Sequence, residues 1–207
     1  MINIAVMASG RGSNFAAIAR AALKPDWPGE VSVLICDREK APVLEKAERF
    51  NIDGYYLDPG EYGDRRQFES EAADLIAAHD ADLVALAGFM RLLSPYFIER
   101  FPDRIMNIHP SLLPAFRGLK AQKKALEAGV KVTGCTVHFV TEELDEGPII
   151  MQAPVKVKED DDEEKLSRRI RRQEHLIYPR SIELYARGCL EIREGKVRIK
   201  PSCRKNL

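Results

Sequence analysis

Short apolar runs alternate with amphipathic segments along the first half of the chain. The apolar runs predict strands, and the segments between them repeat apolar residues every three to four positions, as on one face of a helix. In the segment 65–79, for example, Phe68, Ala72 and Ile76 fall on one side. We therefore expect strands at 2–7, 31–36, 54–58, 82–87 and 104–109, and helices at 14–23, 41–50, 65–79 and 94–101. Repeated β-α-β units of this kind predict a parallel sheet with helices on both faces.

The pattern changes after residue 109. A loop that contains proline and glycine precedes a helix expected at 119–128, and a long helix is expected at about 162–187. Between these helices, the apolar runs at 134–140 and 148–157 are close enough along the chain to form an antiparallel pair. The predicted fold class is thus α/β and Rossmann-like, with a mostly parallel central sheet flanked by helices and antiparallel strands toward the C-terminal part.

Composition and charge exclude several classes of protein. Hydrophobic residues make up 45% and charged residues 31% of the chain, which is typical of a globular domain. Lys+Arg and Asp+Glu both number 32, so no net field attracts nucleic acid or an anionic membrane. Acidic residues precede the basic run at 168–172, which favours a solvated helix face there. The start, MINIAVMASG, lacks the basic segment of a signal peptide, and no apolar run reaches membrane-spanning length. We expect a cytoplasmic protein.

The four cysteines are far apart in the sequence. The spacing of Cys36, Cys135, Cys189 and Cys203 supports neither a metal site nor a disulfide framework. Cys36 and Cys135 lie within apolar runs and are expected in the core. We therefore expect free thiols, as in a cytoplasmic protein, and no metal.

A glycine-containing loop, ASGRGSNF, follows the first strand and opens the first helix. Backbone N–H groups at a helix N-terminus attract an anion, and glycine lets the backbone approach it. Gly10 and Gly12 fit the dinucleotide fingerprint, but the third glycine is replaced by Phe15, whose ring opposes the close packing that a pyrophosphate loop uses. Ser13 and Asn14 can add hydrogen bonds or cap the helix. One phosphate monoester suits this loop better than NAD; a tight turn with a helix cap is the alternative.

A polar pair ends the fifth predicted strand. Asn107 and His109 are two positions apart, so they share one face of that strand, and Pro110 ends its pairing. Two polar side chains then project together from the carboxyl end of a strand, where open α/β sheets bind ligands.

Several motifs together resemble the phosphoribosylglycinamide formyltransferase family. These are SGRGSN (9–14), LAGFMRLLSP (86–95), NIHPSLLPAF (107–116), GCTVHFVTEELDEGPII (134–150) and RRQEHLIYP (171–179). HPSLLP alone would indicate only the wider group of formyl-folate hydrolases and transferases. The resemblance implies metal-free transfer of the formyl group of 10-formyltetrahydrofolate to the amine of glycinamide ribonucleotide, N1-(5-phospho-D-ribosyl)glycinamide, in de novo purine biosynthesis.

The resemblance also implies which residues form the site. The catalytic residues would be Asn107, His109 and Asp145. The ribonucleotide would be bound by Gly12, Ser13, Asn14 and Glu174, although a surface position is the alternative for the glutamate. The folate would contact Arg65, Met90, Arg91, Leu92, Leu93 and Asn107.

The same resemblance implies how the chain is organised. We expect a single formyltransferase domain, residues 1–207, because no linker or repeat interrupts it. It would consist of a phosphate-binding half (about 1–110), a folate and catalytic half (about 111–190) and a short C-terminal extension. We expect a monomer or homodimer that binds small molecules and neither nucleic acid nor membrane.

The chemistry of formyl transfer explains the choice of catalytic residues. Attack of an amine on the formyl carbon puts negative charge on oxygen, which preorganised donors must meet. Asn107 offers an amide donor and a protonated His109 a charge-assisted one, while Asp145 would keep the imidazole protonated and oriented. The other histidines, His79, His138 and His175, are assigned structural or solvent-facing positions.

One departure and several alternatives remain. Lys120 stands where the family often has histidine, so an auxiliary imidazole is not expected there. Methionyl-tRNA formyltransferase and formyltetrahydrofolate deformylase share the chemistry, but each usually carries a further domain that 207 residues are not expected to hold. A nucleotide-binding oxidoreductase with Asp37 as its ribose acid, or a non-catalytic nucleotide-binding module, would belong to other classes.

Overall fold

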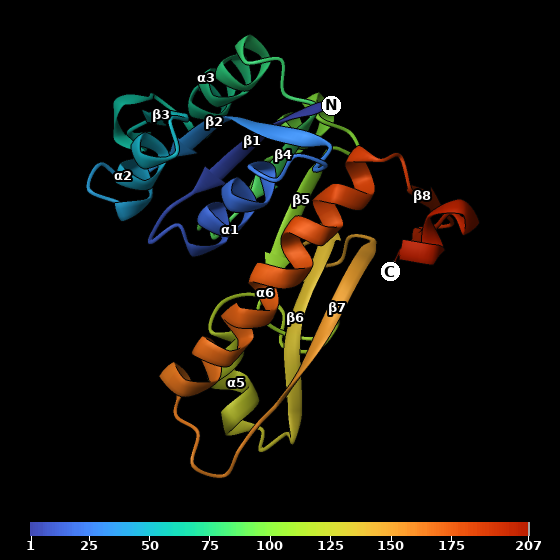
Figure 1. Ribbon diagram of the computed structural model, residues 1–207. Coiled ribbons are helices and arrows are strands. Elements are labelled where there is room, and N and C mark those ends of the chain that lie inside the picture. Colours follow the sequence, from blue (N-terminus) through green and yellow to red (C-terminus); the bar gives the residue numbers. More distant parts are fainter. Residues whose placement is uncertain (207) are drawn as a thin grey trace. The chain divides into compact units, whose positions relative to one another are not determined.

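The computed structural model describes residues 1–206 and divides the chain into two compact units (Figure 1). The first unit ends at Met106 and the second begins at Asn107. The strand β5 (Ile105–His109) crosses this boundary, so its first two residues belong to one unit and its last three to the other.

The first unit is a parallel α/β layer. Its strands follow the order β3-β2-β1-β4-β5, and β1 pairs in parallel with both β2 and β4. The strands are β1 (Ile2–Ala8), β2 (Gly29–Cys36), β3 (Asp53–Tyr56) and β4 (Leu83–Leu86). The helices are α1 (Ser13–Ala22), α2 (Pro42–Arg49), α3 (Arg65–Ala78) and α4 (Pro95–Arg100), with a short 3-10 helix η1 (Pro59–Glu61). Residues 4–8 of β1 are inaccessible to solvent, as expected for a parallel strand covered by helices on both faces.

Polar side chains set where several helices begin. The carboxylate of Asp64 accepts a hydrogen bond from the N–H of Gln67 (2.9 Å) at the start of α3. The hydroxyl of Ser94 accepts from the N–H of Phe97 (3.4 Å) at the start of α4. Such caps satisfy N–H groups that have no partner within the helix.

The second unit combines antiparallel strands with a long helix. The last residues of β5 are followed in the strand order by β6 (Val132–Phe139) and β7 (Ile149–Lys156), and β6 and β7 pair antiparallel. Figure 1 shows α6 (Glu163–Ala186) lying along this pair. The remaining elements are α5 (Ala121–Glu127), β8 (Leu190–Arg193), β9 (Lys196–Ile199) and the 3-10 helix η2 (Pro201–Asn206).

The predicted fold class is confirmed: parallel strands flanked by helices come first, and antiparallel strands follow. Each predicted strand and helix is present, with ends that differ by a few residues. The β8–β9 hairpin was not predicted, because its strands have four residues each and are only half-buried, so they lack an apolar run. None of the helices in the described part of the chain is long and apolar enough to cross a membrane.

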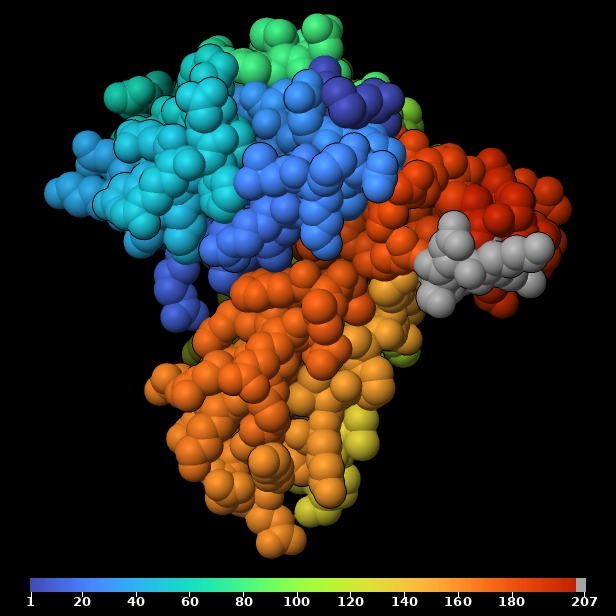
Figure 2. Space-filling model, viewed as in Figure 1, coloured from blue at the N-terminus to red at the C-terminus, as the bar shows by residue number. Residues whose placement is uncertain are grey.

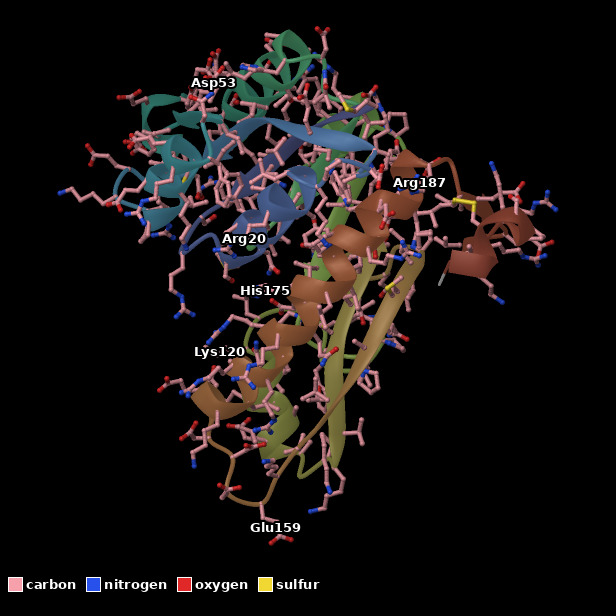
Figure 3. All side chains as sticks on the ribbon, in the orientation of Figure 1. Arg20, Asp53, Lys120, Glu159, His175 and Arg187 are labelled. Carbon is pink, nitrogen blue, oxygen red and sulfur yellow. A yellow bond between two sulfur atoms is a disulfide. The ribbon has the colours of Figure 1, made fainter. Side chains whose placement is uncertain are left out.

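Acidic side chains mark the start of α6. The carboxylate of Asp162 caps the helix by accepting from the N–H of Lys165 (2.7 Å), and Glu163 and Glu164 occupy the first turn, near the positive end of the helix dipole. The first half of α6 lies on the surface in the space-filling view (Figure 2). Glu159, just before the helix, points into solvent (Figure 3).

The expectation of free thiols is wrong for two of the four cysteines. Cys189, three residues after the end of α6, forms a disulfide with Cys203 in η2, 14 positions along the chain (Figure 3). The intervening β8–β9 hairpin folds back and brings the two sulfurs together, which spacing alone does not reveal. Cys36 and Cys135 are free and buried, as predicted.

Replacing Cys203 with serine should lower the free energy of unfolding by up to about 3 kcal/mol, because the disulfide closes a loop of this length in the unfolded chain. Urea unfolding of both proteins, with and without dithiothreitol, measures the effect. The reductant should destabilise the wild type and leave the variant unchanged. Equal stability of the two proteins in oxidising buffer would show that the disulfide only ties down a locally fraying end.

Candidate active site

Four polar side chains gather in the second unit. Asn107 and His109 come from the end of β5, His138 from β6, and Asp145 from the connection between β6 and β7. His109, His138 and Asp145 are buried and Asn107 is half-buried. The structure thus brings together the three residues that the sequence proposed as catalytic, and adds a fourth.

His109 lies between two hydrogen-bond acceptors. Its Nδ1 is 3.3 Å from Oδ2 of Asp145, and both side chains are almost fully buried, with 7% and 6% exposed. On the other side of the ring, Nε2 donates to the carbonyl oxygen of Phe116 (3.0 Å). A neutral imidazole has one N–H, whereas the imidazolium has two and can satisfy both acceptors. Both ring nitrogens of His109 therefore face an acceptor.

Asp145 is held by the backbone around it. Its φ is 54°, in the left-handed region, and its Oδ2 accepts a hydrogen bond from the N–H of Gly118 (2.8 Å). A Cβ at Gly147, two residues on, would lie 1.8 Å from the carbonyl oxygen of Phe139, so the loop can pass there only with glycine. This close passage fixes the path of the loop that carries the carboxylate.

His138 completes the cluster and was missed by the sequence analysis. Its Nδ1 donates to the carbonyl oxygen of Phe139 (2.8 Å), so Nε2 is the unprotonated nitrogen of the neutral ring. Nε2 accepts a hydrogen bond from Nδ2 of Asn107 (3.3 Å) and is 3.8 Å from Oδ1 of Asp145. Burial lowers the pKa of His138, which keeps the ring neutral and able to accept. The ring therefore sets the orientation of the Asn107 amide.

Of the two positions predicted for His138, structural and solvent-facing, the structure shows the buried, structural one. In the sequence this histidine is one of several polar residues alternating along a strand, with nothing to distinguish it from Thr136. Its place opposite Asn107 depends on the pairing of strands that are distant in the sequence. No motif within β6 could have indicated that partner.

Substituting glutamine for His138 should make stability less dependent on pH. Because burial lowers the pKa of His138 below its ordinary value of about 6.5, the unfolded chain binds this proton more readily than the folded one. The contribution to stability is therefore complete above that value and is lost as the pH falls below it. Urea unfolding at pH 7.5 and pH 5 should show a larger difference in the wild type than in His138→Gln. Equal differences would contradict a neutral, buried ring.

Gly12 forms the turn at which the glycine loop of the first unit enters α1. Gly12 is the N-cap of α1 with φ 66°, and a Cβ there would lie 2.7 Å from Cβ of Val43. Ser13 is half-buried and Asn14 is buried. Phe15 is fully buried and meets Phe50 edge-on, with ring centres 6.1 Å apart. An open hollow of ≈ 590 Å³ lies beside the loop, between residues 9–11 and 37–42.

Apart from Asn107, which belongs to the second unit, the residues predicted to contact folate lie in the first unit. The guanidinium of Arg65, at the start of α3, donates a hydrogen bond to the carbonyl oxygen of Leu92. Met90 and Leu92 are 60% and 62% exposed, unusually high for apolar side chains. The guanidinium of Arg91 lies 5.3 Å from the centre of the Phe68 ring.

Glu174 is buried in α6, with 6% of its surface exposed, so the alternative of a surface position is wrong. Its negative charge acts on the thiol of Cys135 in β6. Burial, with this charge as the second cause, raises the pKa of Cys135 to about 12, which makes the thiol inert.

Residues 2–182 match the family described as formyl transferase. The chain belongs to the formyl transferase family. It is 42% identical over 183 residues to phosphoribosylglycinamide formyltransferase of Bacillus subtilis (strain 168), an alignment that covers 88% of this chain and 94% of that protein. The solved glycinamide ribonucleotide transformylase 1 of Symbiobacterium toebii is 52% identical, with a TM-score of 0.95 over 96% of this chain and 94% of that one.

The family also includes longer proteins. The trifunctional purine biosynthetic protein adenosine-3 of Gallus gallus is 42% identical over 197 residues, which is 95% of this chain. This chain spans about a fifth of the length of that relative, 20%.

Two further sequence expectations concern Lys120 and metal ligands. Lys120 is exposed, has φ 60° and is the N-cap residue of α5 (Figure 3). Within residues 1–206, no three His, Cys, Asp or Glu side chains gather as the ligands of a metal ion would.

Proposed function

We propose that this chain transfers the formyl group of 10-formyltetrahydrofolate to the amine of glycinamide ribonucleotide, in purine biosynthesis. The observation that carries the proposal is the cluster of the half-buried Asn107 with the buried His109 and Asp145 in a chain of the formyl transferase family. The relatives named phosphoribosylglycinamide formyltransferase support this choice of acceptor.

The reaction replaces one C–N bond by another. The lone pair of the amine adds to the formyl carbon, and the carbonyl electrons become a negative charge on its oxygen. Collapse of this tetrahedral species breaks the bond to N10 of the folate, which takes up the proton that the amine loses. The protein must therefore stabilise a transient oxyanion and hold both nitrogens near one carbon.

The cluster contains the groups that these steps need. The Asn107 amide, oriented by His138, has a second N–H that the bond to His138 does not use. Nε2 of His109 donates to the carbonyl oxygen of Phe116, and a formyl oxygen would replace that oxygen as acceptor. Asp145, whose Oδ2 is 3.3 Å from Nδ1 of His109, would balance the positive charge of the imidazolium. None of these steps uses a metal ion.

Binding of the two co-substrates is proposed for the remaining residues. Gly12, Ser13 and Asn14 would hold the phosphate of the ribonucleotide, because Gly12 is the N-cap of α1 and the first N–H groups of a helix attract an anion. Glu174 would face the glycinamide or ribose portion. The folate would contact Asn107, Arg65 and the segment 90–93, where exposed apolar side chains suit a flat ring and the two arginines suit its carboxylates.

The test is to supply 10-formyltetrahydrofolate with and without glycinamide ribonucleotide and to follow both products by mass spectrometry. Formylated ribonucleotide should form only when both substrates are present. Release of formate from the folate alone would contradict transfer and favour a deformylase. Absence of turnover in both mixtures would contradict every formyl-folate activity and favour a binding module.

We also propose a cytoplasmic monomer or homodimer without a nucleic-acid partner. Both co-substrates are anions that do not diffuse across membranes, which supports a reaction in the cytoplasm. The equal numbers of basic and acidic residues, 32 each, support the absence of a nucleic-acid partner.

A further inference from the structure

The segment 90–94 presents apolar side chains to solvent although it belongs to no helix or strand. Met90 and Leu92 are each about three-fifths exposed, at 60% and 62%. Irregular segments with exposed side chains are usually mobile, because few contacts restrain them. The backbone of this segment is instead held by hydrogen bonds at three positions.

The three hydrogen bonds involve the backbone of residues 90, 92 and 94. The N–H of Met90 donates to Oγ of Ser9 (2.9 Å). The carbonyl oxygen of Leu92 accepts from the guanidinium of Arg65. The N–H of Ser94 donates to Oε1 of Glu69 (2.9 Å), and its hydroxyl donates to Oε2 of the same carboxylate.

Glu69 contributes to two of these three contacts, one directly and one through Arg65. Besides holding Ser94, its Oε1 accepts from Nε of Arg65 (2.9 Å), and Arg65 in turn holds Leu92. Glu69 is 2% exposed, whereas the side chain of Arg65 is 45% exposed, so the carboxylate of the pair lies inside the unit. Burying a charge costs free energy unless it is paired and hydrogen-bonded.

The position of Glu69 within α3 would suit an apolar residue. Its neighbours on the helix, Phe68, Ala72 and Ala73, are buried core residues. An aliphatic side chain there would add to the core without any desolvation of charge. The carboxylate is therefore explained by what it holds, namely the backbone of the segment 90–94.

We propose that Glu69 is a positioning residue that holds Arg65 and the segment 90–94 in the shape that receives the flat ring system of the formyl-folate. The proposal rests on the proposed function, since it deepens the assignment of the folate side. A segment that is already ordered loses little conformational entropy when a ligand binds, and this raises affinity. Loss of the carboxylate charge should therefore weaken the binding of folate and leave the binding of the ribonucleotide unchanged.

The test compares Glu69→Gln with Glu71→Gln, the same change at an exposed position two residues along α3. Glutamine keeps the shape of the side chain but lacks the charge that holds Arg65. In Glu69→Gln the KM for 10-formyltetrahydrofolate should rise about tenfold, as expected from freeing a few immobilised groups. The KM for glycinamide ribonucleotide should stay within about twofold of wild type. Glu71→Gln should resemble the wild type in both constants.

Hydrogen exchange of the ligand-free proteins gives a readout that does not depend on activity. The amides of residues 90–94 should exchange faster in Glu69→Gln than in the wild type or Glu71→Gln, while those of β1 stay protected. Ser94→Ala removes one contact to the carboxylate and should shift both readouts in the same direction, by less. If Glu69→Gln fails to fold, the same two measurements on Ser94→Ala test the proposal.

Two outcomes would overturn the inference. One is an unchanged folate KM in a folded Glu69→Gln that turns over, and the other is an equal rise in both KM values, which would indicate a general loss of structure. A wild type without turnover would instead contradict the proposed function. The exchange measurement would then still decide whether Glu69 orders the segment.

Discussion

Replacing Asp145 with asparagine should lower kcat about 10²–10⁴-fold, the range typical of losing one positioned acid–base or oxyanion contribution. Asparagine keeps an oxygen that can accept from the N–H of Gly118, so the loop should keep its path. It removes the negative charge 3.3 Å from Nδ1 of His109, and with it the reason for that ring to carry a second proton. The KM values should change much less, because the interaction matters most when charge develops on the formyl oxygen.

The matched control is Glu146→Gln, which makes the same carboxylate-to-amide change at the next residue. Glu146 is exposed, and its ion pair is with Arg117. Its kcat should remain near that of the wild type. The NMR chemical shifts of the His109 ring nitrogens at neutral pH should change toward the values of a neutral imidazole in Asp145→Asn. They should not change in Glu146→Gln. Unchanged nitrogen signals would exclude the ion-pair role even if activity were lost.

Replacing Gly147 with alanine should reduce both stability and kcat. The new Cβ would lie 1.8 Å from the carbonyl oxygen of Phe139, so the backbone of the loop or of β6 must move. That same oxygen accepts the N–H of His138, and the loop carries Asp145. A shift therefore displaces two members of the cluster at once. We expect kcat to fall about 10²-fold, as a misplacement of about 1 Å can cause, and the free energy of unfolding to fall by roughly 2–4 kcal/mol.

Gly10→Ala serves as the stability control for this change, because no atom lies within 4 Å of the Cβ that it would add. Urea unfolding should place Gly10→Ala near the wild type and Gly147→Ala well below it. Steady-state kinetics should show that the loss in Gly147→Ala is mainly in kcat. Wild-type stability of Gly147→Ala would mean that the loop can move to accommodate the new Cβ. It would contradict the inference that the close passage at Gly147 fixes the path of the loop.

Much of the fold follows from local pattern. The apolar runs that became β1 and β2 are continuous because parallel strands are covered on both faces, and a continuous run is visible in sequence. The helix starts at Asp64 and Asp162 are equally local, since a cap involves residues three positions apart. The β8–β9 hairpin and the Cys189–Cys203 disulfide escaped prediction because neither has a periodic or motif-like signal.

The site residues can likewise be separated into those that a local pattern indicates and those that it does not. Asn107 and His109 were predictable as a pair, because two residues apart on a strand means one face. The family resemblance added Asp145, and its contact with His109 is the geometry expected of it. Their catalytic and binding roles, like those of the glycine loop and the folate segment, remain predictions.

What the sequence by itself determined is the order of the elements, the α/β class and the pair of polar residues at the end of β5, because each depends on residues that are neighbours along the chain. Only the tertiary structure decided that His138 orients Asn107, that Glu69 is buried beneath the segment 90–94, and that Cys189 meets Cys203. Those contacts join residues 14, 25 and 31 positions apart. The physical reason is that strand pairing and helix packing choose such partners, and the energies that favour them belong to the folded core rather than to any local stretch.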